Sequence, residues 1–306
     1  MDKFPAEYIE DYNLLGTFRG LQEAIADRYS SQMMRCPVHL SIGQEYWLPI
    51  IRRLVRNGDR CFSSHRSHSM YMALGGNFER LIAELHGLEN GCVSGLGGSM
   101  HLKDISVGLE QSVPIVGSSI GLALGSALAA QKKNQDVLTV AYFGDGACEE
   151  GIVHEALNMS YVLNLPILFI CENNAYSCNT HVRRRQSSSR MSRFADAHGI
   201  ESVTIAQSMP YSLLNIKIED AFRVARKKPY FLEVLSYRLY EHCGSSVDRD
   251  KGDRIESEYN TSLREDFYRL LRSRYPSVLA CYQDAFAYYS SIIDEYSAKN
   301  KELIFQ

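Results

Sequence analysis

Three short runs of consecutive apolar residues constrain the fold of this 306-residue chain most strongly. They read VLTVAYF at 137–143, LPILFICE at 165–172 and YFLEVLS at 230–236. Such a run, without polar alternation, is typical of a strand that is buried on both faces of a parallel sheet. Helical patterns separate the runs, at 117–133 and from about 149 to 163. The sequence therefore predicts an α/β fold with a mainly parallel sheet flanked by helices.

Helical segments are expected on both sides of this α/β region. Residues 7–35 carry apolar positions at helical spacing, and residues 44–57 form a second candidate helix that ends at Asn57-Gly58. The tracts 60–76 and 91–101 have the composition of loops. The part from Ile255 to Lys299 is predicted to be mostly helical. Because no repeat or linker interrupts the chain, we expect a single domain over residues 1–306, with helical extensions at both ends.

Composition argues against several classes of protein. Hydrophobic residues make up 45% and charged residues 23%, as in ordinary globular proteins. The net charge of −3 argues against nucleic acid or an anionic membrane as a partner. No run approaches the roughly 20 apolar residues of a membrane span. The eight cysteines form no CxxC pair and no signal or transit peptide is evident, which predicts reduced thiols in a cytoplasmic protein.

Polar residues follow two of the predicted strands. Asp145 stands between Gly144 and Gly146, and Asn174 follows the next strand, 29 positions later. Ligands of open α/β sheets bind beyond the carboxyl ends of the strands, so neighbouring strands would bring these side chains together. Carboxylate and amide oxygens suit Mg²⁺, and glycines let backbone amides approach a phosphate. GDG alone is more often a simple turn, but its pairing with the second motif favours a magnesium–diphosphate site.

The two motifs together resemble the thiamine-diphosphate signature. Residues 144–177, GDGACEEGIVHEALNMSYVLNLPILFICENNAYS, are similar without a gap to the α subunit of two-component 2-oxoacid dehydrogenases, which act on pyruvate, branched-chain 2-oxoacids or acetoin. The likeness continues through HLSIGQE, FSSHRSH, SGLGGSMHL, PIVGSSIGLALGSALA and SYRLYEH, and so covers roughly residues 35–245. It implies a thiamin-diphosphate-binding fold in which this chain forms the diphosphate-binding domain.

The resemblance also implies roles for individual residues. The side chains of Asp145 and Asn174 and the backbone carbonyl of Tyr176 would hold the metal. Gly146 and Ala147 would offer amides to the diphosphate, and Arg66 and Arg238 would bind its oxygens, which guanidinium groups match in geometry. The other implied cofactor-binding residues are His65, Pro114, Val116, Gly144 and His242. The implied catalytic residues, where histidines can donate or accept protons near neutral pH, are His101, His242, His39 and His68.

Partners follow from the same resemblance. The cofactors would be thiamine diphosphate and Mg²⁺. A separate β subunit would supply the pyrimidine-binding domain, with the glutamate that activates the cofactor, in an α2β2 heterotetramer. The substrate would be a 2-oxoacid, which is decarboxylated before its acyl unit passes to lipoamide on an acyltransferase partner.

Three segments depart from the family pattern and keep alternatives open. They are the arginine run Arg183–Arg185, AQSMPYS at 206–212 and CGSSVDRDKG at 243–252. The arginine run is interpreted as a solvated loop, with a patch for an anionic substrate or partner as the alternative. The third departure raises a second function, a carboligase that adds a two-carbon unit from pyruvate to an aldehyde or ketone metabolite such as a sugar. A nicotinamide-dependent oxidoreductase is disfavoured because no GxGxxG lies between a strand and a helix, and a catalytically silent subunit is disfavoured by the retained site residues.

Overall fold

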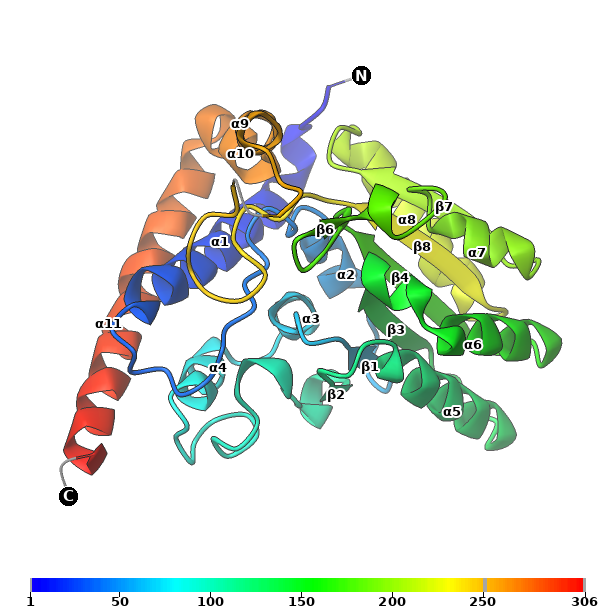
Figure 1. The fold of residues 1–306 in the computed structure, drawn as a ribbon, viewed down its shortest axis with the longest axis horizontal. Helices are drawn as coiled ribbons and strands as arrows, with labels where there is room; N and C mark the ends of the chain where they lie inside the picture. The colour runs from blue at the N-terminus through cyan, green and yellow to red at the C-terminus, as the bar shows by residue number, and fades with distance from the viewer. Residues whose placement is uncertain (1, 250–251, 305–306) are drawn as a thin grey trace.

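A computed structural model of the chain describes residues 2–249 and 252–304, so residues 250 and 251 of the third departure lie outside the described residues. Figure 1 shows a sheet with helices around it, and α1 and α11 crossing beside each other at one side. The helices and strands are α1 (Ile9–Tyr29), α2 (Leu48–Leu54), β1 (Arg60–Ser63), α3 (His68–Leu74), α4 (Phe78–Leu85), β2 (Leu109–Ser112), α5 (Ser118–Lys132), β3 (Thr139–Gly144), α6 (Gly151–Val162), β4 (Ile167–Asn173), β5 (Tyr176–Ser177), β6 (Thr180–His181), α7 (Ser192–Ala197), β7 (Glu201–Ala206), α8 (Tyr211–Ala225), β8 (Tyr230–Leu235), α9 (Glu256–Arg264), α10 (Phe267–Arg274) and α11 (Pro276–Ile304).

The main sheet is parallel throughout, with the strand order β2-β1-β3-β4-β8-β7. The three predicted strands are β3, β4 and β8, which lie side by side, so the predicted α/β class with a parallel sheet is confirmed. The prediction that residues 60–76 form a loop is wrong, because they contain β1 and α3. Only Cys61 and Phe62 are apolar in β1, which is too short a run to mark a strand.

Side chains of the central strands alternate between two hydrophobic clusters, one on each face of the sheet. In β3, Val140 and Tyr142 join a cluster with residues of α1, α2 and α8. Ala141 and Phe143 join the other cluster, with residues of α5, α6 and α7. Because helices cover both faces, the strands between them need apolar residues at every position, which explains the unbroken apolar runs in the sequence.

The terminal extensions pack against each other. Contact between α1 and α11 is close at Gly16 and Gly20, where an added Cβ would lie 2.5 Å from the carbonyl oxygen of Val278 and 2.6 Å from that of Tyr282. The helical extensions at both ends are therefore confirmed, although two expected helices are shorter than predicted. The first ends at Tyr29 rather than at residue 35, and the second covers only Leu48–Leu54 of 44–57.

The order of the strands places a topological switch point between β1 and β3. From β1 the chain moves outward to β2 and then returns to the opposite side of β1 as β3. Ligands of open α/β sheets bind at such a switch point, beyond the carboxyl ends of the strands. Among the described residues, no helix is both long enough and apolar enough to cross a membrane. All eight cysteines are free thiols.

Candidate cofactor site at the carboxyl edge of the sheet

The paired strands β3 and β4 bring the two polar motifs together. Gly144 lies opposite Glu172 in the register of these strands, so Asp145 and Asn174 emerge at the same edge. Both side chains are buried. Asn174 accepts a hydrogen bond on Oδ1 from the backbone amide of Tyr176 at 3.1 Å and donates from Nδ2 to Gln44 at 3.0 Å. The predicted proximity of the two motifs is confirmed by this strand pairing.

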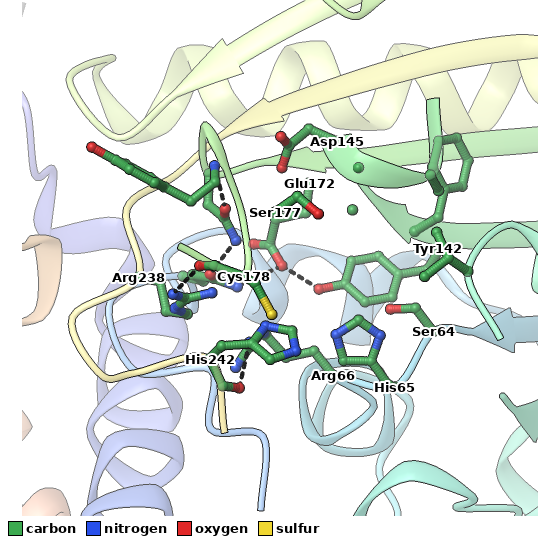
Figure 2. Close-up of a pocket in the computed structure, with 18 of the residues that line it drawn as sticks. Ser64, His65, Arg66, Tyr142, Asp145, Glu172, Ser177, Cys178, Arg238 and His242 are labelled. Atoms are coloured by element: carbon green, nitrogen blue, oxygen red, sulfur yellow. Dashed lines mark hydrogen bonds between the residues drawn. The ribbon is translucent and has the colours of Figure 1, made fainter. Parts of the chain in front are cut away.

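A pocket opens at this edge (Figure 2). Its lining comes from the ends of β3 and β4, from the segments that follow β1, β2, β3, β4 and β8, and from Gln44 before α2. In Figure 2, Asp145 lies on the opposite side of the pocket from His65 and His242. A short 3₁₀ helix, Asp145–Glu149, starts at the pocket, and its first amides have no carbonyl partner within the helix. The predicted site residues that line the pocket are His65, Arg66, Val116, Gly144, Asp145, Gly146, Ala147, Asn174, Tyr176, Arg238 and His242.

Four predicted site residues lie outside this lining, and their roles stay predictions. His39 is behind the pocket wall, with its ring centroid 5.1 Å from that of His65 and 5.3 Å from that of His242. His68 is fully buried between Gln22 and Ser99. The others are His101, which is exposed and bonded through Nδ1 to the carbonyl of Gly97 at 2.9 Å, and Pro114, which is half-buried.

Two buried guanidinium groups face the pocket in different electrostatic settings. Arg238 forms an ion pair with Asp248 at 2.5 Å. Arg66 donates to the backbone carbonyls of Leu40 at 2.5 Å and His242 at 3.0 Å, and among the described residues no carboxylate lies within ion-pair distance of it. Burial, reinforced by the charge of Arg238, lowers the pKa of Arg66 to about 9. Among the described residues Arg66 therefore has no ion-pair partner, although the Glu172 carboxyl in the same pocket opposes the fall in its pKa.

The histidines near the pocket are held neutral. Burial, together with the positive charge of Arg66, lowers the pKa of His39 to about 2, that of His65 to about 4 and that of His242 to about 3. The Nδ1 atom of His39 is buried and, in the part of the chain that the structure describes, has no hydrogen-bond partner. At neutral pH these imidazoles can therefore donate and accept hydrogen bonds without adding charge.

Glu172 is a pocket residue to which the motifs assigned no role. Its carboxylate accepts hydrogen bonds from Tyr142 and, at 2.8 Å, from Gln44, and burial raises its pKa to about 7. Glu172 ends the apolar run 165–172, and a charged residue in that position could have identified it as a candidate site residue. Gln44, in the segment before α2, thus bonds to Glu172 at the end of β4. The same Gln44 side chain accepts a hydrogen bond from Asn174.

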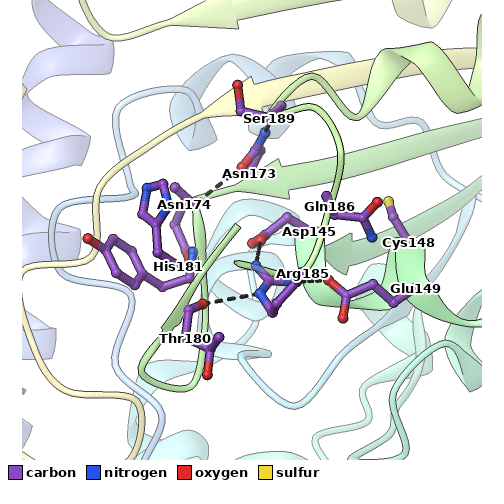
Figure 3. Close-up of polar contacts among 12 residues, drawn as sticks. Asp145, Cys148, Glu149, Asn173, Asn174, Thr180, His181, Arg185, Gln186 and Ser189 are labelled. Atoms are coloured by element: carbon purple, nitrogen blue, oxygen red, sulfur yellow. Dashed lines mark hydrogen bonds and ion pairs between the residues drawn. The ribbon is translucent and has the colours of Figure 1, made fainter. Parts of the chain in front are cut away.

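The arginine run is not a uniformly solvated loop. Arg183 and Arg184 are exposed, as expected, but only 9% of the Arg185 side chain is exposed. Arg185 forms an ion pair with Asp145 (Figure 3). Part of the predicted loop therefore belongs to the site.

The fold defined by this sheet is of the transketolase type. Transketolase from Leishmania mexicana superposes with a TM-score of 0.56 and 16% identity, over 94% of this chain and 48% of that chain. Transketolase from Campylobacter jejuni gives 0.57 and 16%, over 95% and 50%. The chain thus spans about half the length of these transketolases, and the likeness concerns the fold alone.

Sequence comparison identifies relatives of this chain more specifically than the fold does. The α subunit of acetoin:2,6-dichlorophenolindophenol oxidoreductase from Bacillus subtilis is 31% identical over 249 residues, which cover 80% of this chain and 74% of that protein. The α subunit of the pyruvate dehydrogenase E1 component from Rhizobium meliloti is 29% identical over 258 residues, 82% of this chain and 74% of that protein. Residues 15–272 match the family described as "Dehydrogenase E1 component". The chain belongs to this family, among the α subunits of 2-oxoacid dehydrogenases.

Proposed function

We propose that this chain is the α subunit of a thiamine-diphosphate-dependent enzyme that decarboxylates a 2-oxoacid, and that residues 1–306 act as one diphosphate-binding domain. The observation that carries the proposal is the buried guanidinium of Arg66, which has no ion-pair partner among the described residues and lines the same pocket as Asp145 and Asn174 at the carboxyl edge of the sheet. Family membership and the transketolase-type fold both support thiamine diphosphate as the cofactor.

The residues present fit an anionic diphosphate. A buried cation without an ion-pair partner is unfavourable, and phosphate oxygens would give Arg66 such a partner. Arg238 lines the same pocket and would add a second guanidinium. The amides of Gly146 and Ala147, which lie in the first turn of the 3₁₀ helix, would bind the remaining oxygens.

The same corner of the pocket fits Mg²⁺. Side-chain oxygens of Asp145 and Asn174 and the carbonyl oxygen of Tyr176 are hard donors, and Mg²⁺ usually combines one or two carboxylates with phosphate oxygens and water. These three residues would hold the metal, provided that Asp145 is released from its ion pair with Arg185.

Thiamine diphosphate, when bound, supplies the nucleophilic carbon and the electron sink for decarboxylation. The chain itself would position the diphosphate and exclude water. His65 and His242 line the pocket on the side away from Asp145, and their neutral imidazoles would hold or transfer a proton there. We assign His39 a supporting place behind them, because its ring packs against both. We propose that His101, which is exposed, contacts the substrate at the mouth of the site. We propose that His68, which is buried, orients Gln22 and Ser99 behind the pocket wall.

A β subunit would complete the site. The chain corresponds to about half of a transketolase chain, and it exposes apolar side chains beside the pocket: Val116 lines it and is 48% exposed, and its neighbour Ile115 is 72% exposed. Such exposed apolar groups favour an interface with another protein. We infer an α2β2 assembly in the cytoplasm. Pro114 and Val116 would lie near the cofactor ring. The acyl unit would pass to lipoamide on an acyltransferase.

The proposal is tested with this chain and its β-type partner, purified together and supplied with thiamine diphosphate, Mg²⁺ and a series of 2-oxoacids. We expect release of CO₂ with one of these acids and acylation of a lipoyl domain. If CO₂ is released but the two-carbon unit appears in a new carbon–carbon bond to an added aldehyde or ketone, the enzyme is a carboligase. Absence of CO₂ release with all acids, despite an intact complex, would contradict the proposal.

A further inference from the structure

The predicted metal ligand Asp145 already has a cationic partner from its own chain. Arg185 reaches Oδ2 of Asp145 through Nη2 at 2.5 Å (Figure 3). The same guanidinium contacts Glu149 through Nη1 and donates from Nε to the carbonyl oxygen of Thr180 at 3.1 Å. Three acceptors therefore hold Arg185 over the corner of the pocket where the metal would bind.

The two carboxylates that hold Arg185 differ in their exposure. Asp145 is the inner partner, with 2% of its side chain exposed, and Glu149 is the outer partner, with 32% exposed. A buried carboxylate needs a compensating charge, and in the free chain Arg185 provides it. Glu149 is better solvated, so it can keep Arg185 as a partner when Asp145 no longer does.

A divalent cation and a guanidinium would compete for Asp145. Mg²⁺ requires ligand oxygens at about 2.0–2.1 Å in near-octahedral geometry, which leaves little freedom in how the carboxylate is shared. Two cations on one buried carboxylate also repel each other strongly, because the surroundings screen charge poorly. Metal binding is therefore expected to break the contact between Arg185 and Asp145.

We propose that Arg185 is an internal counter-ion of Asp145, which the metal–diphosphate displaces towards Glu149, and that Arg185 thereby lowers the affinity of the free chain for the metal. The inference rests on the proposed function, since it takes Asp145 as a metal ligand. It gives the third residue of the arginine run a role in cofactor loading. An alternative role, direct binding of the diphosphate by Arg185, predicts the opposite effect of removing its charge.

The test compares the full-length wild-type chain with Arg185→Gln, and uses Arg184→Gln as a matched control. Arg184 is the preceding residue, but its side chain is 74% exposed and pairs with Asp253 rather than Asp145. Binding of Mn²⁺ in the presence of inorganic pyrophosphate is measured by electron paramagnetic resonance, and thermal unfolding is measured with and without these ligands. Asp145→Asn is measured in parallel.

For Arg185→Gln we expect Mn²⁺ to bind about tenfold tighter than to the wild type, because no ion pair has to be broken. Without ligand, this variant should unfold at a lower temperature, since Asp145 is left without a counter-charge, and saturating Mn²⁺ and pyrophosphate should close the gap. Arg184→Gln should match the wild type in both measurements.

Equal or weaker Mn²⁺ binding by Arg185→Gln, including a failure of both chains to bind, would overturn the role of Arg185. Failure of the proposed function has a different signature. In that case Asp145→Asn would bind Mn²⁺ with pyrophosphate as tightly as the wild-type chain, whatever the result for Arg185→Gln.

Discussion

At the scale of single residues, Arg66 is a buried guanidinium without an ion-pair partner among the described residues. Arg19 offers a comparison, since it is also a buried arginine but pairs with Glu45 at 2.7 Å and with Asp266 at 2.9 Å. Arginine is seldom fully buried in a protein without a paired charge, and Arg19 has two. Arg66 has only carbonyl acceptors among the described residues, so its charge suits a ligand rather than the free chain.

Replacing Arg66 by methionine should separate stability from binding. We expect Arg66→Met to keep the free energy of unfolding within about 1 kcal/mol of the wild-type value, because removing an unpaired buried charge offsets the loss of its hydrogen bonds to the carbonyls of Leu40 and His242. Pyrophosphate affinity should fall about tenfold or more. Arg19→Met, which strands two buried carboxylates, should lose about 3–5 kcal/mol. Urea denaturation and calorimetric titration with pyrophosphate measure the two effects. Undiminished pyrophosphate binding by Arg66→Met would contradict this account of the pocket.

Stability should also depend on pH through His68. Burial, and secondarily the charge of Arg66, lowers its pKa to about 3 in the folded chain, compared with about 6.5 when unfolded. The unfolded chain binds the proton first, so stability is complete above about pH 6.5 and falls as the pH drops towards 3. For this residue alone the slope is up to about 1.4 kcal/mol per pH unit. Denaturation of wild type and His68→Gln at pH 5–8 should show a smaller pH dependence in the variant, and parallel curves would disprove the assignment.

Residues differ in how far the sequence alone reveals their positions. Asp145 and Asn174 could be placed together because each directly follows a buried strand, and adjacent strands end at one edge. The contact of Arg185 with Asp145 could not be predicted, because it depends on the path of the loop between them, 40 positions along the chain. The same holds for Asp248, which reaches Arg238 from a loop with no periodic pattern.

At the scale of helices and strands, unbroken apolar runs identified β3, β4 and β8, which helices cover on both faces. The sequence did not reveal β1, β2 or β7. In β2 the residues are Leu109–Ser112, with only one apolar side chain, and β7 is an edge strand whose side chains are mostly half-exposed. Such short or edge strands are held by their backbone pairing to a neighbour, and this leaves little trace in the hydrophobic pattern.

The contact between α1 and α11 should be intolerant of any added side chain. At Gly20 a Cβ would lie 2.6 Å from the carbonyl oxygen of Tyr282 and 2.9 Å from Cβ of Ala285. Gly20→Ala should therefore lose about 1–3 kcal/mol of stability, despite the better helix propensity of alanine. Gly125→Ala is the control, since nothing lies within 4 Å of its Cβ position in α5, and it should gain about 0.5–1 kcal/mol. Equal effects in urea denaturation would show that the α1–α11 contact is not tight.

At the scale of the whole molecule, the chain has the transketolase-type fold but spans about half of a transketolase chain. The pocket lies at the carboxyl edge of the sheet, with exposed apolar side chains nearby. Both observations agree with a cofactor that is shared between two subunits. The resemblance in sequence predicts a shared cofactor, whereas composition and periodicity could not predict one, because they carry no information about a partner chain.

The isolated chain should therefore be inactive. With thiamine diphosphate, Mg²⁺ and a 2-oxoacid, we expect CO₂ release at background level until the β-type partner is added, because in the proposed enzyme the partner would supply the group that activates the cofactor ring. Release of ¹⁴CO₂ from carboxyl-labelled substrate, measured as partner is titrated in, should rise to a plateau at one partner per chain. Turnover by the isolated chain at the rate of the complex would refute the shared site.

The central claim is that the carboxyl ends of β3 and β4 hold a metal-bound diphosphate. The most direct measurement is calorimetric titration of thiamine diphosphate with Mg²⁺ into the assembled enzyme, with wild-type chain or with Asp145→Asn. The substitution keeps the shape of the side chain and removes its negative charge, so we expect affinity to fall about 100-fold or more, with the complex intact. Binding by Asp145→Asn at wild-type affinity would contradict the account.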